Sequence, residues 1–195
     1  HCPMTGREAL ERLLSGNQDY LKERLSICPT KAQMEALKDG QHPFAAIVAC
    51  ADSRVPPNLL FNCSLGEIFV VRNAGNVISD FALGSIEYAV SSLRVPLVMV
   101  LGHSGCGAVA GALAGGAKAE SALGKIMAEI APAVEKAKTE AETPQELSAL
   151  AENYNIRNSL EKLKADPVLQ NHPDTLILGA KYDIRTGTVS VLIQE

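Results

Sequence analysis

Two short and strongly apolar runs, residues 44–49 and 97–101, limit what this chain can fold into more than any other feature. Both are rich in Val, Ile, Leu or Ala, which is typical of strands buried on both faces of a parallel sheet. Further strands are predicted at 68–71, 175–179 and 188–193, and helices at 82–93, at 108–113 and twice within 121–163. This alternation predicts an α/β fold: a single domain with a mainly parallel central sheet flanked by helices, and an antiparallel edge strand at its end.

The first 40 residues predict a helical arm attached to this core. Thr5 and Glu8 have the capping-box spacing at the start of a helix over 5–24, and a second helix is expected over 31–38. Leucines at helical spacing give the first helix a narrow apolar stripe, which suits packing on a partner subunit instead of its own core. The predicted boundaries are 1–195 for the domain, 5–40 for the arm and 41–195 for the α/β core.

The bulk composition excludes several classes of protein. A chain of 195 residues with 47% hydrophobic content can bury its own core, and a net charge of −4 argues against nucleic-acid binding. No apolar run reaches the roughly 20 residues that cross a bilayer, and no signal-peptide pattern is visible. We therefore expect no nucleic-acid or membrane partner and a cytoplasmic location.

Five cysteines in a chain of this length do not form a disulfide framework. Cys2, Cys28 and Cys63 have no predicted role beyond that of small apolar side chains or incidental thiols, and nothing in the sequence supports a Cys2–Cys28 bridge.

The residues that follow the two apolar runs predict a metal site. Ligands collect beyond the carboxyl ends of parallel strands, so Cys50, His103 and Cys106 converge if the two strands are neighbours. Two thiolates and one imidazole form a known catalytic zinc set that leaves a fourth position open. Asp52 would either fill that position or accept a hydrogen bond from zinc-bound water. Arg54 would decide between the two by holding the carboxylate away from the metal.

Other interpretations of the same residues stay open at this point. Each Cys can be a buried strand residue, the His can bond to backbone, and Asp52 and Arg54 can form an ordinary surface salt bridge. Activation of Cys106 by His103 would give a redox-active or nucleophilic thiol protein, but that interpretation leaves Cys50 unexplained.

The motifs that contain these residues resemble the signature of the β-class carbonic anhydrases. The likeness covers roughly residues 5–195 and is densest over 41–113. It rests on Cys50-x-Asp-Ser-Arg54 with His103-x-x-Cys106, and it extends through Phe69-Val-Val-Arg-Asn-Ala-Gly-Asn76, Gly84-Ser-Ile-Glu-Tyr-Ala-Val90 and Val100-Leu-Gly-His-Ser-Gly-Cys-Gly107.

The resemblance implies an enzyme that hydrates CO2 reversibly to bicarbonate and a proton. One Zn²⁺ per chain would be held by Cys50, His103 and Cys106, with water or hydroxide as fourth ligand. Asp52 and Arg54 match the family's catalytic dyad, in which the Asp accepts a hydrogen bond from that water or, in a closed state, ligates the metal itself. The resemblance also implies a homodimer, often paired into homotetramers, with active sites at the dimer interface.

The pocket resembles the plant-like type of this family, since the second type depends on a Trp and the chain has none. Gln41 and the backbone near Gly107 would steady the bicarbonate oxygens. Phe69 and Tyr88, supplied across the interface, would keep the pocket apolar together with Val55. Two alternatives remain on the same scaffold: a hydrolase of COS or CS2, and a non-catalytic zinc-stabilised oligomer whose metal is closed off by Asp52.

Overall fold

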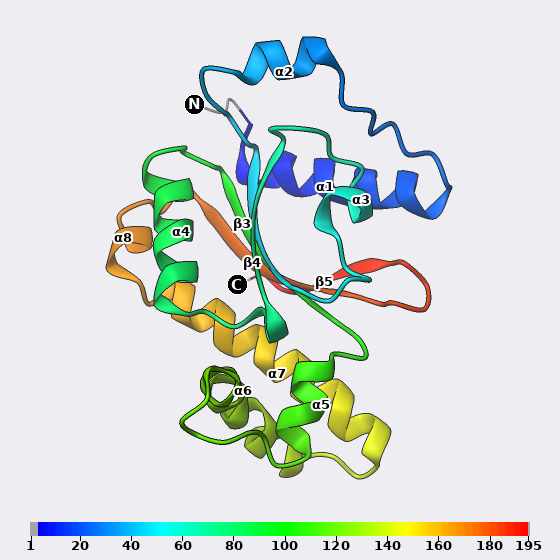
Figure 1. Cartoon of the computed structure of the whole chain (residues 1–195), viewed down its shortest axis with the longest axis vertical. Coiled ribbons are helices and arrows are strands. Elements are labelled where there is room, and N and C mark those ends of the chain that lie inside the picture. The colour runs from blue at the N-terminus through cyan, green and yellow to red at the C-terminus, as the bar shows by residue number, and fades with distance from the viewer. Residues whose placement is uncertain (1–3, 195) are drawn as a thin grey trace.

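The computed structural model describes residues 4–194, and a five-stranded sheet lies at its centre (Figure 1). The strands are β1 (Ala45–Cys50), β2 (Ile68–Asn73), β3 (Leu97–His103), β4 (Leu176–Tyr182) and β5 (Val189–Ile193). Their order across the sheet is β2-β1-β3-β4-β5, and every neighbouring pair is parallel except β4 and β5. The predicted α/β fold, with a mainly parallel sheet and an antiparallel edge strand, is confirmed.

Helices pack around this sheet on both faces and beyond its carboxyl edge. In chain order they are α1 (Gly6–Leu21), α2 (Lys31–Leu37), α3 (Pro57–Leu60), the short 3-10 helix η1 (Ala74–Asn76), α4 (Asp80–Ser91), α5 (Gly107–Leu113), α6 (Ala122–Lys138), α7 (Pro144–Lys164) and α8 (Pro167–Gln170). Among residues 4–194, none of these helices combines the length and the apolar character needed to cross a membrane.

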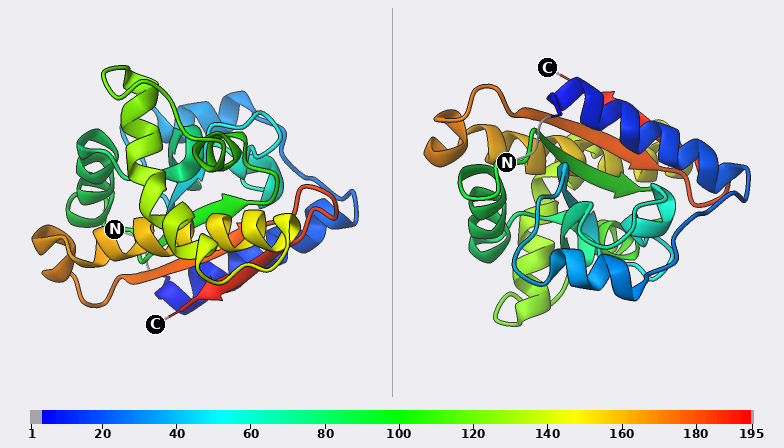
Figure 2. Two further views of the ribbon diagram at one scale, coloured as in Figure 1. Left: turned by 90° about the horizontal axis from the view of Figure 1, so that it is seen from below. Right: turned by 90° about the horizontal axis from the view of Figure 1, so that it is seen from above.

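The central strands are buried on both faces because their side chains alternate between two layers of helices. Ile47 and Met99 point into the cluster that contains residues of α1, whereas Val48 and Val100 point into the cluster formed with α4 and α7. Figure 2 shows α1 on one side of the sheet and α7 on the other. This two-sided burial explains why the two strands are continuous apolar runs in the sequence.

The apolar stripe of α1 packs on the chain's own sheet, so the expectation that it packs on a partner subunit is wrong. Ala9, Leu10 and Leu13 are buried in the same cluster as the central strands. Asn17, which is 1% exposed, adds polar anchors: it donates to the Leu60 carbonyl at 3.1 Å and accepts from the amide of Val189 at 3.0 Å. The helix starts as predicted, with both hydrogen bonds of the Thr5–Glu8 capping box formed.

The fourth strand runs three residues further than the sequence predicts, to Tyr182. The prediction ended it at Gly179, a residue that usually weakens strands. Pairing overrides this local preference, because Lys181 and Tyr182 lie between β3 on one side and β5 on the other. The extension brings Lys181 next to the carboxyl end of β3. Of the cysteines without a predicted role, Cys28 is exposed and Cys63 is buried, while Cys2 lies outside the described residues.

Candidate metal centre

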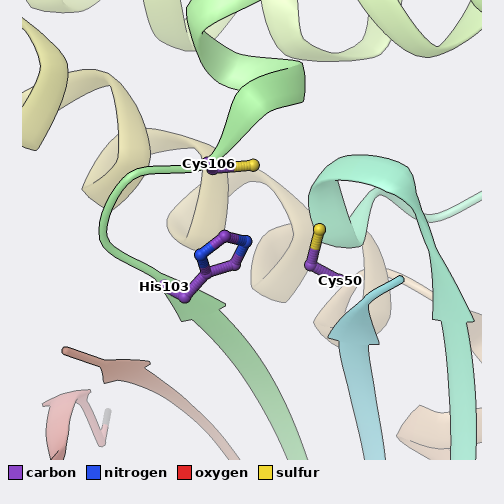
Figure 3. Close-up of side chains that lie close together, drawn as sticks. All are labelled: Cys50, His103 and Cys106. Atoms are coloured by element: carbon purple, nitrogen blue, oxygen red, sulfur yellow. The ribbon is translucent and has the colours of Figure 1, made fainter. Parts of the chain in front are cut away.

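Cys50, His103 and Cys106 meet at the carboxyl ends of β1 and β3 (Figure 3). The two strands pair directly, so their ends are adjacent, and Cys106 follows β3 after a short turn. One sulfur or nitrogen atom from each residue lies within 4.8 Å of the other two, and all three side chains are buried. The convergence expected from the sequence is present, and these residues form a candidate metal site.

The imidazole of His103 is oriented to offer a free lone pair to this cluster. Its Nδ1 lies 2.8 Å from the carbonyl oxygen of Ser104, which can only accept, so Nδ1 carries the proton. Its Nε2 is buried and has no hydrogen-bond partner among the described residues. An unpaired buried nitrogen is costly, whereas a metal ion would use its lone pair. Two sulfur atoms and one imidazole nitrogen are a donor set that suits zinc.

A hydrogen bond between the two candidate ligand thiols shifts their pKa values in opposite directions. A hydrogen bond from the Cys106 thiol, opposed by burial, lowers the pKa of Cys50 to about 4, and the amide of Gly75 adds to this effect by donating to the Cys50 sulfur at 3.3 Å. The pKa of Cys106 is raised well above its ordinary value, because its proton lies in that bond and because the thiol is buried. A cation bound beside both sulfur atoms would favour the thiolate form of each cysteine.

Asp52 stands beside the cluster and is held there by Arg54. The guanidinium Nε donates to Oδ1 at 3.0 Å and Nη2 donates to Oδ2 at 2.7 Å, and the Arg54 amide also donates to Oδ1 at 2.9 Å. The hydrogen bond from the Arg54 side chain is the main cause that holds the pKa of Asp52 far below its usual range. Oδ2 lies 3.8 Å from Nε2 of His103, so the carboxylate borders the metal cluster without belonging to it.

Charged side chains from other elements hold the two ligand loops. Arg72 donates to the carbonyl of Cys50 at 3.0 Å and to that of Asp52 at 2.7 Å. Glu152 accepts from the amides of Gly105 at 2.9 Å and Cys106 at 3.4 Å. The Glu152 carboxylate is paired in turn with Lys181, at 2.9 Å.

Sequence reasoning missed Glu152 and Lys181. Glu152 lies in an Ala-, Glu- and Lys-rich segment where most acidic residues face solvent. A signal was present nonetheless: Glu152, Asn155 and Ser159 share one face with the apolar Ile156, and all are buried. Asn155 and Ser159 donate to the carbonyls of Gly75 and Asn76, both at 2.8 Å. A polar stripe on the buried face of a helix indicates that α7 supports loops.

The three expected pocket residues Gln41, Phe69 and Tyr88 lie away from the cluster of their own chain. Gln41 is exposed and precedes β1, at the strand end opposite to Cys50. Phe69 pairs with Ala46, four residues before Cys50, or about 13 Å along the strand. Tyr88 is 48% exposed and contacts Phe69, with ring centroids 6.0 Å apart.

Val55 and Gly107 lie close to the ligands in sequence but differ in exposure. Val55 follows the Asp52 turn and is fully buried in the core cluster on the α1 side of the sheet. Gly107 directly follows Cys106 as the first residue of α5, and it is exposed. Its backbone is therefore accessible at the edge of the cluster.

Comparisons with known proteins show which family of sequences and which fold this chain is similar to. The sequence profile of the family described as carbonic anhydrase matches residues 45–189. A carbonic anhydrase of Pseudomonas aeruginosa is 34% identical over 187 residues, which cover 89% of this chain and 84% of that protein. Carbonic anhydrase 2 of Mycobacterium tuberculosis is 46% identical over 108 residues, which are 55% of this chain and about half (49%) of that relative. Among solved structures, the Coccomyxa β-carbonic anhydrase in complex with acetazolamide has a TM-score of 0.74 at 27% identity, covering 94% of this chain and 86% of the other.

Proposed function

Because this chain belongs to the carbonic anhydrase family and has the fold of its β class, we propose that it catalyses the zinc-dependent, reversible hydration of carbon dioxide to bicarbonate and a proton. The observation that carries the proposal is the buried cluster of Cys50, His103 and Cys106, in which Nε2 of His103 has no hydrogen-bond partner within residues 4–194. These three residues would hold one Zn²⁺ per chain.

Zinc, when bound, supplies Lewis acidity that lowers the pKa of a water molecule to about 7, as in the carbonic anhydrases that hold zinc with three histidines. The chain's own residues would then set the orientation of that water molecule toward CO2. Asp52 stays ionised throughout the working pH range, because Arg54 keeps its pKa low. It therefore acts as a fixed hydrogen-bond acceptor that turns a lone pair of the nucleophile toward CO2, and it does not carry the released proton.

The position of Asp52 favours a catalytic site over a closed, purely structural one. Both carboxylate oxygens accept hydrogen bonds from Arg54. The same guanidinium donates to the Gly105 carbonyl at 3.2 Å, which holds it in place. For Asp52 to become a metal ligand, this paired arrangement would have to break. The backbone at the start of α5, near Gly107, would steady a bicarbonate oxygen, because the first amides of a helix have no partner within the helix.

A homodimer is part of this proposal, because Gln41, Phe69 and Tyr88 lie far from the cluster of their own chain. A second copy would bring them to the site. The surface that carries Phe69 and Tyr88 suits such contact: β2 is an edge strand with an unpaired side, and Phe81 on the adjacent α4 is 90% exposed. Pairing of two such dimers into a homotetramer is compatible with the second free edge, at β5.

The test is CO2 hydration measured by stopped flow at neutral and mildly alkaline pH, with zinc content determined on the same sample. Fast hydration with about one zinc per chain, as a single three-ligand site requires, is the expected result. Zinc without CO2 hydration would contradict the proposal, and turnover of COS or CS2 by that sample would point to the alternative hydrolase. Absence of zinc, with thiols whose reactivity does not respond to a chelator, would point to a thiol protein.

A further inference from the structure

The peptide unit between Gly105 and Cys106 is held from both sides by charged groups. Its N–H, on Cys106, donates to Oε2 of Glu152 at 3.4 Å, and its carbonyl, on Gly105, accepts from Nη2 of Arg54 at 3.2 Å. Because Arg54 also binds Asp52, one polar chain runs from Glu152 through this peptide to the Asp52 carboxylate. This polar chain includes the backbone of Cys106, so it connects one candidate metal ligand to Asp52, which borders the metal cluster.

Glu152 is itself fixed by charge. It is 8% exposed, and a carboxylate this deeply placed needs strong partners. Its Oε1 lies 2.9 Å from Nζ of Lys181, which also donates to Asn153 at 2.8 Å. Lys181 comes from β4, where it pairs with Gly102 just before the ligand His103. The carboxylate is therefore positioned between α7 and the strand end that carries the metal ligands.

The turn that Glu152 holds has a conformation the chain would not readily keep by itself. Gly105 has φ of +67°, in the left-handed region, and its amide donates to Glu152 at 2.9 Å. A Cβ at this position would come within 3.0 Å of Ile184. Glycine permits this turn but does not favour it over other conformations. The hydrogen bonds from the amides of Gly105 and Cys106 to the Glu152 carboxylate do favour it.

We propose that Glu152, clamped by Lys181, is a positioning residue for this centre: it sets Cys106 for metal binding and, through the Gly105 carbonyl and Arg54, sets the orientation of Asp52. The proposal rests on the proposed function in that it takes the cluster to be a zinc site. Charged and polar groups behind metal ligands orient those ligands, and their removal typically weakens metal binding or activity by about 10- to 100-fold.

The experiment compares Glu152→Ala and Glu152→Gln with the wild type, and uses Glu161→Ala, an exposed position on the same helix, as matched control. Zinc affinity is measured by competition with a chelator, and the cobalt-loaded proteins are compared by their visible absorption, which reports ligand geometry. Glu152→Ala is expected to bind zinc about 10- to 100-fold more weakly and to show a changed cobalt spectrum. Glu152→Gln keeps an oxygen that accepts from both amides, so it should recover most of the affinity; Glu161→Ala should match the wild type.

Wild-type zinc affinity and an unchanged cobalt spectrum in Glu152→Ala would overturn the proposal. The proposal would also be overturned if Glu152→Gln lost as much zinc affinity as Glu152→Ala and both metal-free variants unfolded at a correspondingly lower denaturant concentration. That pattern would mean that Glu152 has a purely structural role. If Glu152→Ala does not fold, Lys181→Met takes its place and is expected to weaken zinc binding several-fold, with wild-type affinity again contradicting the proposal. Metal affinity and spectrum do not depend on the reaction catalysed, so a wild type that binds zinc but does not hydrate CO2 would refute the proposed function and leave this test intact.

Discussion

Arg54 binds both carboxylate oxygens of Asp52 through two hydrogen bonds, 3.0 Å from Nε to Oδ1 and 2.7 Å from Nη2 to Oδ2. This bidentate geometry is available to arginine and not to lysine. It keeps the carboxylate ionised and directed, although the Asp52 side chain is only 15% exposed. The pair thus gives the metal cluster a fixed acceptor beside its ligand atoms.

Replacing Asp52 with Ala should leave zinc bound and remove most of the activity. The metal ligands come from three other residues, so zinc content should stay near one per chain, while the loss of a preorganised acceptor should lower kcat by about 10²-fold or more. Stopped-flow CO2 hydration and metal analysis on the same preparation measure both. Turnover equal to that of the wild type would remove Asp52 from the mechanism.

Cys106→Ala should abolish zinc binding and activity together. With one thiolate missing, only Cys50 and His103 remain in the cluster, and two ligands do not form a stable zinc site. Cys28→Ala, which removes an exposed thiol, is the matched control and should retain zinc and turnover. A zinc-loaded and active Cys106→Ala protein would refute the assignment of the metal site.

Phe81→Asp should weaken the dimer and lower the activity with it. Phe81 is 90% exposed on α4, about two helical turns before Tyr88, and a carboxylate at a buried interface position commonly weakens association by about tenfold or more. Light scattering over a concentration series, with hydration measured in parallel, tests this. Met34→Asp changes an exposed apolar residue on α2 and should alter neither property. An unchanged dimer in Phe81→Asp would show that the copies meet elsewhere.

Gly16→Ala should destabilise the protein through the docking of α1. A Cβ at this position would lie 1.8 Å from the carbonyl oxygen of Phe61, a backbone atom that cannot rotate away. Overpacking of this kind costs about 1–3 kcal/mol in the free energy of unfolding. Urea denaturation provides the measurement, and Ser15→Ala, at an exposed position of the same helix, is the control. Equal stability of the two variants would mean that α1 does not pack on this chain as described.

The buried thiol of Cys63 should make the protein less stable in alkali. Burial raises the pKa of Cys63 from 9.0 to about 12, so the folded state retains this proton at pH values where the unfolded chain has lost it. The contribution is complete below the unfolded pKa and is lost as pH rises through the folded one, so stability should fall by about 1.4 kcal/mol per pH unit between the two. Denaturation from pH 8 upward should show a shallower fall for Cys63→Ala than for the wild type, with Cys28→Ala as control. Identical slopes for Cys63→Ala and the wild type would contradict the assigned shift.

Local patterns predicted most elements and the candidate metal ligands, because the information for both lies within a few neighbouring residues. Thr5 and Glu8 specify a helix start, and the two apolar runs specify buried strands. Parallel strands bring their carboxyl ends to one edge, so Cys50 and Cys106 were expected to meet although 56 positions separate them. Pairing of β1 with β3 is the condition that the tertiary structure supplied.

What the sequence by itself determined is local: the strands, the Cys and His side chains that follow them, and the Asp-x-Arg spacing that lets Asp52 and Arg54 pair. Only the tertiary structure decided which of many similar charged residues support the candidate metal site. Glu152 differs from the exposed acidic residues of its helix only in facing the turn at Gly105, and Lys181 becomes its partner only because β4 extends past Gly179. The sequence also does not show whether the apolar stripe of α1 packs on its own sheet or on a partner subunit, because its burial depends on the surface that it contacts. Spacing along the chain fixes local geometry, whereas burial and long-range pairing arise only when distant segments pack together.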